Sequence, residues 1–237
     1  MKKTLCLLLI IGIAAVAVLT SGCTDNSSVS GDTAGGDGPE GQDAPGNDTA
    51  ELEPVTSVYT ENNSASSVRA VKGDTIVIML EENPTTGYSW NLSAGSGLAL
   101  LDDQYVQDPA VEGMTGAGGV RNWTFEVTED GVQNVSAIYK RSWENITGDE
   151  DIFELTVEVV PEHTIIHAVG TVAYVDIEGG FYGIAGDDNT NYDPVNLGDE
   201  FRKDGLKVEF TAYPAEDMAS FHMWGQLIEL RSIRSAA

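Results

Sequence analysis

Residues that could do covalent or metal chemistry are few in this chain. The only histidines are His163, His167 and His222, and no spacing among them suggests a zinc site. Its two cysteines, Cys6 and Cys23, both lie near the N-terminus. The sequence has neither a Gly-x-Ser-x-Gly nucleophile elbow nor a His-Glu-x-x-His motif. We therefore expect no enzymatic activity and no cofactor.

One run of acidic and amide residues resembles part of a metal site. Four such residues fall at alternate positions, as at the start of an EF-hand calcium loop: Asp187, Asn189, Asn191 and Asp193. Tyr192 stands where that loop requires glycine, and Gly198 stands where it requires glutamate. The run is a weak calcium candidate, and a solvated hairpin loop is the simpler interpretation.

The strongest candidate for binding a partner is segment 83–90, which reads Asn-Pro-Thr-Thr-Gly-Tyr-Ser-Trp. Pro84 fixes its own φ and suits the second position of a turn, and Asn83 can bond back to the backbone to begin that turn. Gly87 can take a positive φ and let the chain reverse. We expect the hydroxyls of the two intervening threonines to point outward. The segment is either a plain hairpin or a pre-shaped probe for another protein's cleft.

This segment resembles the signature loop of the chagasin-type inhibitors of papain-like cysteine proteases. That family has two further loop motifs in a fixed order. The glycines of a Gly-x-Gly-Gly loop follow in this chain: Gly116, Gly118 and Gly119. An Arg-Pro-Trp loop is matched by Arg141 and Trp143, with Ser142 where the family usually has proline. Three motifs in order within residues 55–161 are a specific signal.

The resemblance implies that the three loops gather at one end of the domain and fill a protease cleft without covalent chemistry. It implies that Thr85 lies nearest the enzyme's catalytic cysteine and histidine. Trp143 is the expected anchor, and Arg141 could stack or bind a carboxylate on the enzyme. The expected protease-binding residues are Asn83, Pro84, Thr85, Thr86, Gly87, Tyr88, Gly116, Gly118, Gly119, Arg141 and Trp143.

The first 23 residues have the pattern of an export signal. Lys2 and Lys3 precede an apolar run from Leu5 to Leu19, and small residues then lead to Cys23. The arrangement resembles a lipoprotein box, in which Cys23 becomes the lipidated first residue. It predicts a protein that is exported and tethered by lipid to the outer face of the cell membrane. An ordinary cleaved signal or an uncleaved anchor is the alternative.

Acidic residues far outnumber basic ones in the full sequence, with 38 Asp and Glu against 12 Lys and Arg. The formal net charge is −26, which argues against nucleic-acid binding because that needs a basic face. Residues 24–54 are rich in Gly, Ser, Asp and Asn and have no Lys or Arg, so we expect a disordered acidic linker. Asn-x-Ser/Thr triplets, such as those at Asn122 and Asn145, would permit glycosylation outside the cell.

Short strands must position the three motifs. Residues 75–80 are an apolar run, and residues 123–128 and 153–159 alternate apolar with polar side chains. These patterns, with a further strand at 133–139, predict an all-β fold, an antiparallel β-sandwich over residues 55–161. The family resemblance implies that this sandwich is immunoglobulin-like.

Residues 162–237 are expected to form a second, smaller domain. Strand-like runs lie at 169–177, 181–184, 206–213 and 221–230, and a short helix or irregular segment at 197–203. They suggest a small β-barrel, OB-like in character, and the region resembles a small microbial β domain of unknown function.

Two functions therefore compete for this chain. The first is a membrane-tethered inhibitor of papain-like cysteine proteases. The second is a cell-surface adhesion or ligand-binding sandwich with no protease partner, in which Trp143 could be a core residue. Generic sandwiches have no reason to carry the three ordered motifs, so the motifs favour the inhibitor.

Overall fold

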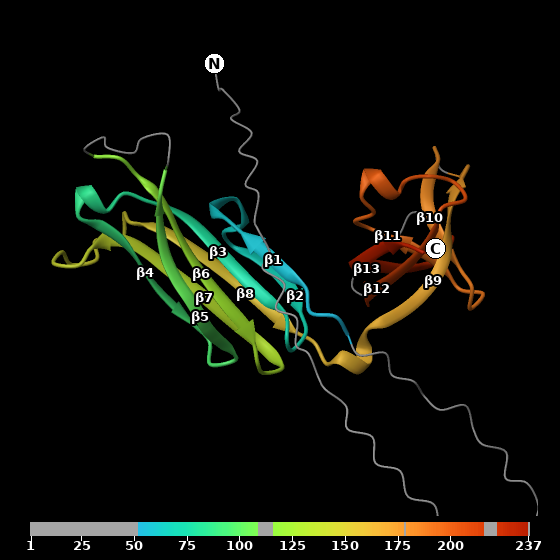
Figure 1. The fold of residues 1–237 in the computed structure, drawn as a ribbon, viewed down its shortest axis with the longest axis horizontal. Coiled ribbons are helices and arrows are strands. Elements are labelled where there is room, and N and C mark those ends of the chain that lie inside the picture. Colours follow the sequence, from blue (N-terminus) through green and yellow to red (C-terminus); the bar gives the residue numbers. More distant parts are fainter. Residues whose placement is uncertain (1–51, 109–115, 178, 216–221, 237) are drawn as a thin grey trace, which may run out of the picture. The chain divides into compact units, whose positions relative to one another are not determined.

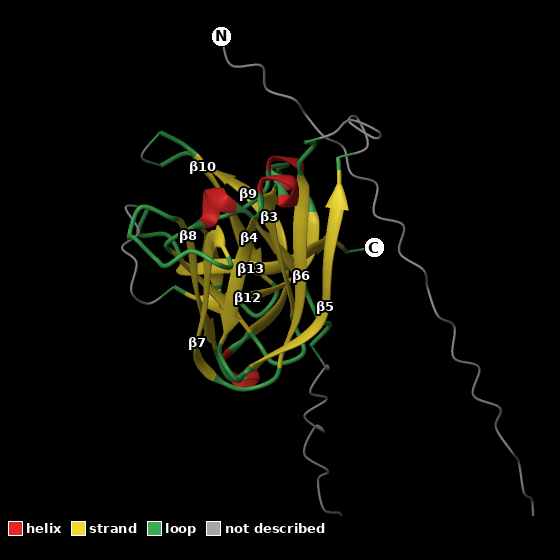
Figure 2. Cartoon of the chain, turned by 90° about the vertical axis from the view of Figure 1, so that its left-hand side faces the viewer, coloured by secondary structure: helices red, strands yellow, loops and turns green. Residues whose placement is uncertain are grey.

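The described part of the chain is built almost entirely from β-strands. The computed structural model describes residues 52–108, 116–177, 179–215 and 222–236. Among them the only helical pieces are short 3-10 turns (Figure 2): η1 (Glu61–Asn63), η2 (Pro84–Thr86), η4 (Glu162–Thr164) and η5 (Asp199–Phe201). No helix in these ranges is long and apolar enough to cross a membrane. The expected all-β class is confirmed.

Two four-stranded sheets form a β-sandwich (Figure 1). One has the order β1-β3-β6-β5, with bounds Thr56–Tyr59, Thr75–Glu82, Gly119–Val127 and Leu98–Gln107. The other has the order β2-β8-β7-β4, with bounds Ser66–Ala70, Asp151–Val159, Gly131–Arg141 and Tyr88–Ala94. Most neighbouring strands are antiparallel, but β1 lies parallel to β3 and β2 parallel to β8.

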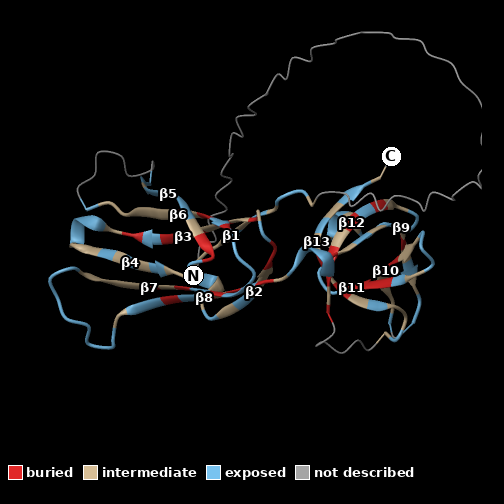
Figure 3. Cartoon of the chain, turned by 90° about the horizontal axis from the view of Figure 1, so that it is seen from below, coloured by how far each residue is buried: buried red, intermediate tan, exposed pale blue. Residues whose placement is uncertain are grey.

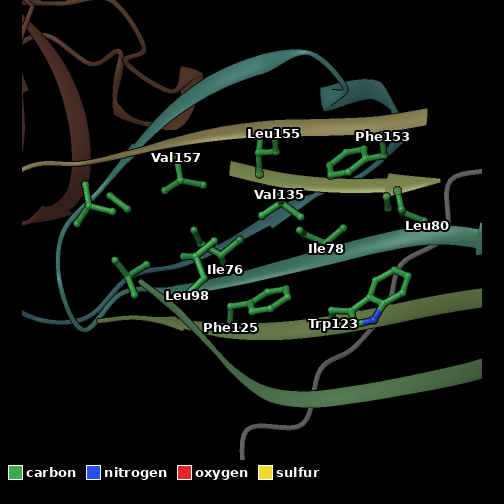
Figure 4. Packing of buried hydrophobic residues seen from close by; sticks show 14 residues of the cluster. Ile76, Ile78, Leu80, Leu98, Trp123, Phe125, Val135, Phe153, Leu155 and Val157 are labelled. Carbon is green, nitrogen blue, oxygen red and sulfur yellow. The ribbon is translucent and has the colours of Figure 1, made fainter. Parts of the chain in front are cut away.

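Alternate side chains fill the space between the two sheets. Ile78 and Leu80 of β3 are fully buried and point toward Phe153 and Leu155 of β8 (Figure 4). Strands β3 and β8 alternate buried residues with partly or fully exposed ones along most of their length (Figure 3). Each such buried side chain stabilises the fold by about 2 kcal/mol. The period-two pattern read from the sequence is therefore the pattern of the core.

The strand register brings three connections to one end of the sandwich. Glu82, the last residue of β3, pairs with Gly119, the first residue of β6. Tyr88, the first residue of β4, pairs with Arg141, the last residue of β7. The short connection from β3 to β4 crosses from one sheet to the other between these two pairs. The loops that carry the three motifs must therefore begin or end beside one another.

Residues from 166 onward form a closed five-stranded barrel. Its order is β10-β11-β13-β12-β9, with bounds Phe181–Gly186, Asn191–Pro194, Gln226–Ser235, Lys207–Pro214 and Ile166–Val175. Val172, Ile184, Val208 and Ile228 are fully buried inside it. Only β11 and β13 pair in parallel, and closure leaves no free sheet edge. The barrel expected from the sequence is confirmed, and five strands are the number in an OB-fold.

The last strand of the barrel begins later than expected. The sequence suggested a strand from residue 221, but β13 starts at Gln226. Met223 has a φ of 46°, and the ring of His222 stacks on Phe181 at 3.7 Å between centroids. Aromatic packing against β10 therefore takes precedence over strand pairing in this segment.

A buried ion pair joins the sandwich to the barrel. The described residues belong to one compact unit, in which Arg231 of β13 pairs with Asp74, the residue before β3. Both side chains are nearly buried, and Asp74 also accepts hydrogen bonds from the backbone N–H groups of Val55 and Val71 at 2.9 and 3.0 Å. A division into two domains at residue 161 stays a prediction.

Candidate functional site

Three loops meet at the end of the sandwich where β3 gives way to β4. We call residues 83–88, 116–119 and 141–143 together the three-loop edge. Direct hydrogen bonds join the second and the third of these segments to the first. The structure thus brings together all eleven residues that the sequence suggested for protease binding.

The first loop is held by hydrogen bonds inside itself. The Asn83 Oδ1 atom accepts from Thr85 Oγ1 at 2.6 Å and from Thr85 N at 3.3 Å, and Thr86 Oγ1 donates to the Asn83 carbonyl at 2.7 Å. Gly87 closes the turn with φ at 81°. The expectation that both hydroxyls point outward was wrong, because Asn83 offers two acceptors within the turn. Pro84, Thr85 and Thr86 are nevertheless exposed.

The glycine loop meets the first loop through its backbone. Asn83 Nδ2 donates to the carbonyl of Gly116 at 3.1 Å, so one carboxamide links two of the three loops. At Gly119 a Cβ atom would collide with the backbone of Val106 and Gln107, which explains why only glycine fits there. Residues 109–115 lie outside the described part of the chain.

Arg141 of the third loop turns back onto the first. Its Nε donates to the carbonyl of Thr86 at 3.3 Å, and its guanidinium lies 4.5 Å from the ring centroid of Tyr88. Its Nη1 pairs with Glu144 at 3.0 Å. The hydrogen bond that Arg141 donates to the Glu144 carboxylate is the main reason that the pKa of Arg141 lies above its usual value. Arg141 therefore supports the first loop, besides any contact it could make with a partner.

Trp143 rests on the glycine that closes the first loop. A Cβ atom at Gly87 would lie 2.5 Å from Trp143 Cη2, so the indole ring occupies the space that any other residue would need. The side chain is nonetheless 70% exposed. The competing expectation of a core position for Trp143 does not hold. Trp123 lies in the core, and Trp90 packs against it partly buried.

Two residues that the sequence did not single out support this edge from below. The Tyr139 hydroxyl accepts the backbone N–H of Asn83 at 2.9 Å, and its ring packs between those of Tyr88 and Trp90. The carboxylate of Glu82 is buried and accepts the N–H of Trp90 at 3.0 Å. The position of Tyr139 in a strand that alternates apolar and polar residues was the available signal, whereas nothing local marked Glu82.

The rest of the third loop forms one wall of a cavity of about 640 Å³. Glu150 closes this loop by accepting hydrogen bonds from Thr147 N at 2.7 Å and Gly148 N at 2.8 Å. The bond from the Thr147 N–H is the largest of the effects that lower the pKa of Glu150 to about 2. Thr86, Tyr88, Arg141 and Glu144 are among the residues that line the cavity. At neutral pH the ionised Glu150 carboxylate therefore accepts both N–H groups of this loop.

The remaining candidates do not join this site. Asp187 pairs with Lys207, and Asp193 lies 2.8 Å from His222 Nδ1. Asn191 donates to the carbonyl of Trp224 at 3.4 Å, while Asn189 adopts a left-handed conformation. The four candidate calcium ligands thus have separate surroundings, and the described residues contain no group of three His, Cys, Asp or Glu that could hold a metal. Cys23 lies outside the described residues.

Comparison with known proteins points to a single family. The family model described as "Chagasin family peptidase inhibitor I42" matches residues 69–157. Amoebiasin-1 of Entamoeba histolytica is 34% identical over 100 residues, which cover 42% of this chain and 96% of that protein. Chagasin of Trypanosoma cruzi is 25% identical over 100 residues, which cover 40% of this chain and 89% of that protein.

A similar solved structure is the cysteine protease inhibitor EhICP2 from Entamoeba histolytica. It is 25% identical with a TM-score of 0.42, and the match covers 46% of this chain and all of that one.

Proposed function

The chain belongs to the chagasin family of peptidase inhibitors, and from this premise we propose that its three-loop edge blocks the active-site cleft of a papain-like cysteine protease. Inhibition of this kind needs no covalent step. Pro84, Thr85 and Thr86 enter the cleft as a wedge, and the catalytic thiol meets a turn that offers no productively placed peptide bond. The family model that matches this chain is that of a family of peptidase inhibitors, and we propose that the peptidase inhibited by this chain is a cysteine protease.

The observation that carries this proposal is that the wedge is exposed and already ordered. Its backbone and hydroxyls are held by Asn83, and neighbouring loops hold it through Gly116, Arg141 and Trp143. Little conformational entropy is left to lose on binding, so more of the contact free energy contributes to affinity. A simple hairpin would not need contacts from two other loops.

Trp143 has two roles in this proposal. Its ring supports Gly87 in the free protein, and the 70% of its surface that stays exposed makes the anchoring contact at the rim of the cleft. Tryptophan is enriched among residues that dominate interface energies. The glycine loop contributes mainly backbone, because Gly116 and Gly118 have no side chain to hold the enzyme away.

We also propose that the protein is exported from the cell and that a lipid attached to Cys23 anchors it to the membrane. The linker of residues 24–54 is followed by Val55, whose backbone N–H donates a hydrogen bond to the carboxylate of Asp74, the residue before β3. The wedge follows the other end of β3, eight residues further, which is about 25 Å along an extended strand. Val55 and the wedge therefore lie beside opposite ends of β3.

The test is a titration of papain with the chain starting at Thr24. We expect enzyme activity to fall in proportion to added inhibitor until near equivalence. Thr85→Arg should weaken inhibition at least about 100-fold, since it places a bulky charge at the tip of the wedge. Thr128→Arg is the matched control, because Thr128 is exposed and follows the opposite end of β6. Failure to inhibit any papain-like enzyme would favour the adhesion function.

A further inference from the structure

Asparagines in this chain occur in glycosylation triplets far more often than chance allows. Serine and threonine occupy 35 of 237 positions, so about two of the twelve asparagines should have one of them two places later. Eight of the twelve do, and seven of these have a residue other than proline between. Two of the seven, at Asn26 and Asn47, lie outside the described residues. The other five are all in the sandwich.

Four of the five sandwich asparagines that begin a usable triplet are exposed: Asn62, Asn91, Asn134 and Asn145. Asn91 and Asn134 lie at outward positions of β4 and β7, where they alternate with core residues. Asn62 is in the turn η1, and Asn145 is in the loop that follows Trp143. A branched, hydrated group attached at these positions would project into solvent without displacing the core.

The fifth sandwich triplet differs from the others. Asn122 is only half-exposed, and its Oδ1 atom is buried and has no hydrogen-bond partner in the described structure. Asn122 is therefore the least accessible of the five triplet asparagines once the sandwich has folded. This position provides an internal comparison for the four exposed ones.

The eighth asparagine, Asn83, immediately precedes the wedge. Asn83-Pro84-Thr85 has threonine in the third place, but proline in the middle place prevents glycosylation. The same proline that shapes the turn therefore keeps a glycan off the residues proposed to enter the protease cleft. The asparagines of the barrel, Asn189, Asn191 and Asn196, begin no triplet at all. Within the described residues, the usable triplets therefore lie in the sandwich and are absent from the barrel, and proline blocks the one in the first loop.

We propose that Asn62, Asn91, Asn134 and Asn145 carry N-linked glycans and that Asn83 and Asn122 do not. The donor is a lipid-phosphate-linked oligosaccharide outside the cell membrane. The amide Nδ2 forms a bond to the anomeric carbon, the bond from that carbon to the phosphate oxygen breaks, and the lipid phosphate leaves with the electron pair. The amide loses one proton to the transferase. This inference rests on the export proposed above, because such transfer takes place outside the cytoplasm.

Glycans at these positions would act on the proposed inhibitor in two ways. Those on Asn91 and Asn134 would cover the outer face of one sheet and shield its backbone from the proteases that the protein meets. The glycan on Asn145 would lie two residues beyond Trp143, at the side of the three-loop edge. It would favour enzymes whose surface leaves room there, so it would add selectivity without touching the wedge.

Mass spectrometry of the full chain purified from its native cells tests the proposal. Chymotrypsin is the better choice for digestion, because the chain has only 12 Lys and Arg residues. We expect glycopeptides at all four exposed asparagines and unmodified peptides at Asn83 and Asn122. Bare asparagine at all four positions would overturn the proposal. Glycan on Asn122 would overturn the argument from accessibility.

Expression in the secretory pathway of yeast supplies a second measurement. Asn145→Gln should remove one glycan from the intact mass, and Asn189→Gln, at an exposed asparagine outside any triplet, should remove none. An unchanged glycan number in Asn145→Gln contradicts the assignment. Papain inhibition by bacterially produced, glycan-free protein is measured separately, so failure of the glycan proposal and failure of the inhibitor proposal are distinguishable.

Discussion

The three-loop edge of the sandwich and segment 222–225 of the barrel both place a tryptophan on a glycine. At the edge the indole of Trp143 lies where a Cβ of Gly87 would be. In the barrel the six-membered ring of Trp224 covers Gly183 of β10 in the same way. Each glycine is needed because the absent side chain lets an aromatic ring lie directly on the backbone.

The two clusters differ in what their rings do next. In the barrel Phe181 stacks on His222 at 3.7 Å and meets Trp224 edge-on at 5.8 Å between ring centroids. These rings therefore pack their apolar surfaces against one another. At the edge most of Trp143 stays exposed, beside the exposed Pro84 and Thr85. Residues of a packing cluster bury their apolar surface against one another. Residues of a binding surface are held in place by their neighbours but keep their apolar surface exposed to solvent. This difference is why we assign the inhibitory function to the edge.

The largest expected effect comes from breaking the ion pair between Arg231 of the barrel and Asp74 of the sandwich. It tests whether the barrel stabilises the sandwich without taking part in inhibition. Arg231→Ala leaves Asp74 buried without its ion partner, so we expect the free energy of unfolding to fall by about 4 kcal/mol. Urea denaturation measures this change. Arg234→Ala is the control, because Arg234 is exposed and pairs with Glu209 at the surface, and it should cost less than about 1 kcal/mol. Inhibition by the folded Arg231 variant should not change, and a loss of inhibition would make the barrel part of the site.

Gly87→Ala should break the edge itself. Gly87 and Gly73 both have a positive φ, so alanine at either strains the backbone by about 1–2 kcal/mol. Only at Gly87 does the new Cβ also push against Trp143, since nothing lies within 4 Å at Gly73. We expect the inhibition constant to rise about 100-fold for Gly87→Ala and to stay constant for Gly73→Ala. Equal inhibition constants would contradict a preformed edge.

Paired tryptophan substitutions compare the two clusters directly. Trp143→Ala should raise the inhibition constant about 30-fold and change the melting temperature by less than about 2 °C, because its side chain is mostly exposed. Trp224→Ala should leave inhibition unchanged and lower stability by about 2 kcal/mol, because it opens a cavity over Gly183. Thermal unfolding and papain titration give both values. The reverse pattern would exchange the roles assigned to the clusters.

The smallest expected effect concerns pH. The pKa of Glu150 is lowered in the folded protein to about 2, so its ionised form stabilises the third loop above about pH 4.5. That contribution is lost as the pH falls toward 2. Amide hydrogen exchange at Thr147 and Gly148 should therefore speed up, relative to unstructured peptide, as the pH falls from 4.5 to 2. Glu150→Gln should show the faster exchange already at pH 6, and an unchanged rate there would exclude the carboxylate as the cause.

Much of this molecule is predictable from local patterns. Alternation at residues 123–128 and 153–159 is enough to place strands, because a half-buried strand repeats every two residues. The three motifs identify the edge because turns depend on Pro84 and Gly87 at the positions where they occur. Contacts between loops are different, since they join residues far apart in sequence. Neither the inward turn of Arg141 onto Thr86 nor the support from Glu82 had a local signal, and strand alternation marked Tyr139 without showing which loop it supports.

By itself the sequence determined the all-β class, the positions of four sandwich strands, the presence of the barrel and the identity of the three motif loops. The strands follow from side-chain period, which acts over a few residues, whereas the motif loops were identified by their resemblance to those of the chagasin-type inhibitors. The tertiary structure alone decided that Asn83 joins two loops, that Trp143 rests on Gly87 while remaining exposed, and that Asp74 meets Arg231. Such contacts depend on strand register and sheet packing, and neighbouring residues in the chain carry no information about either.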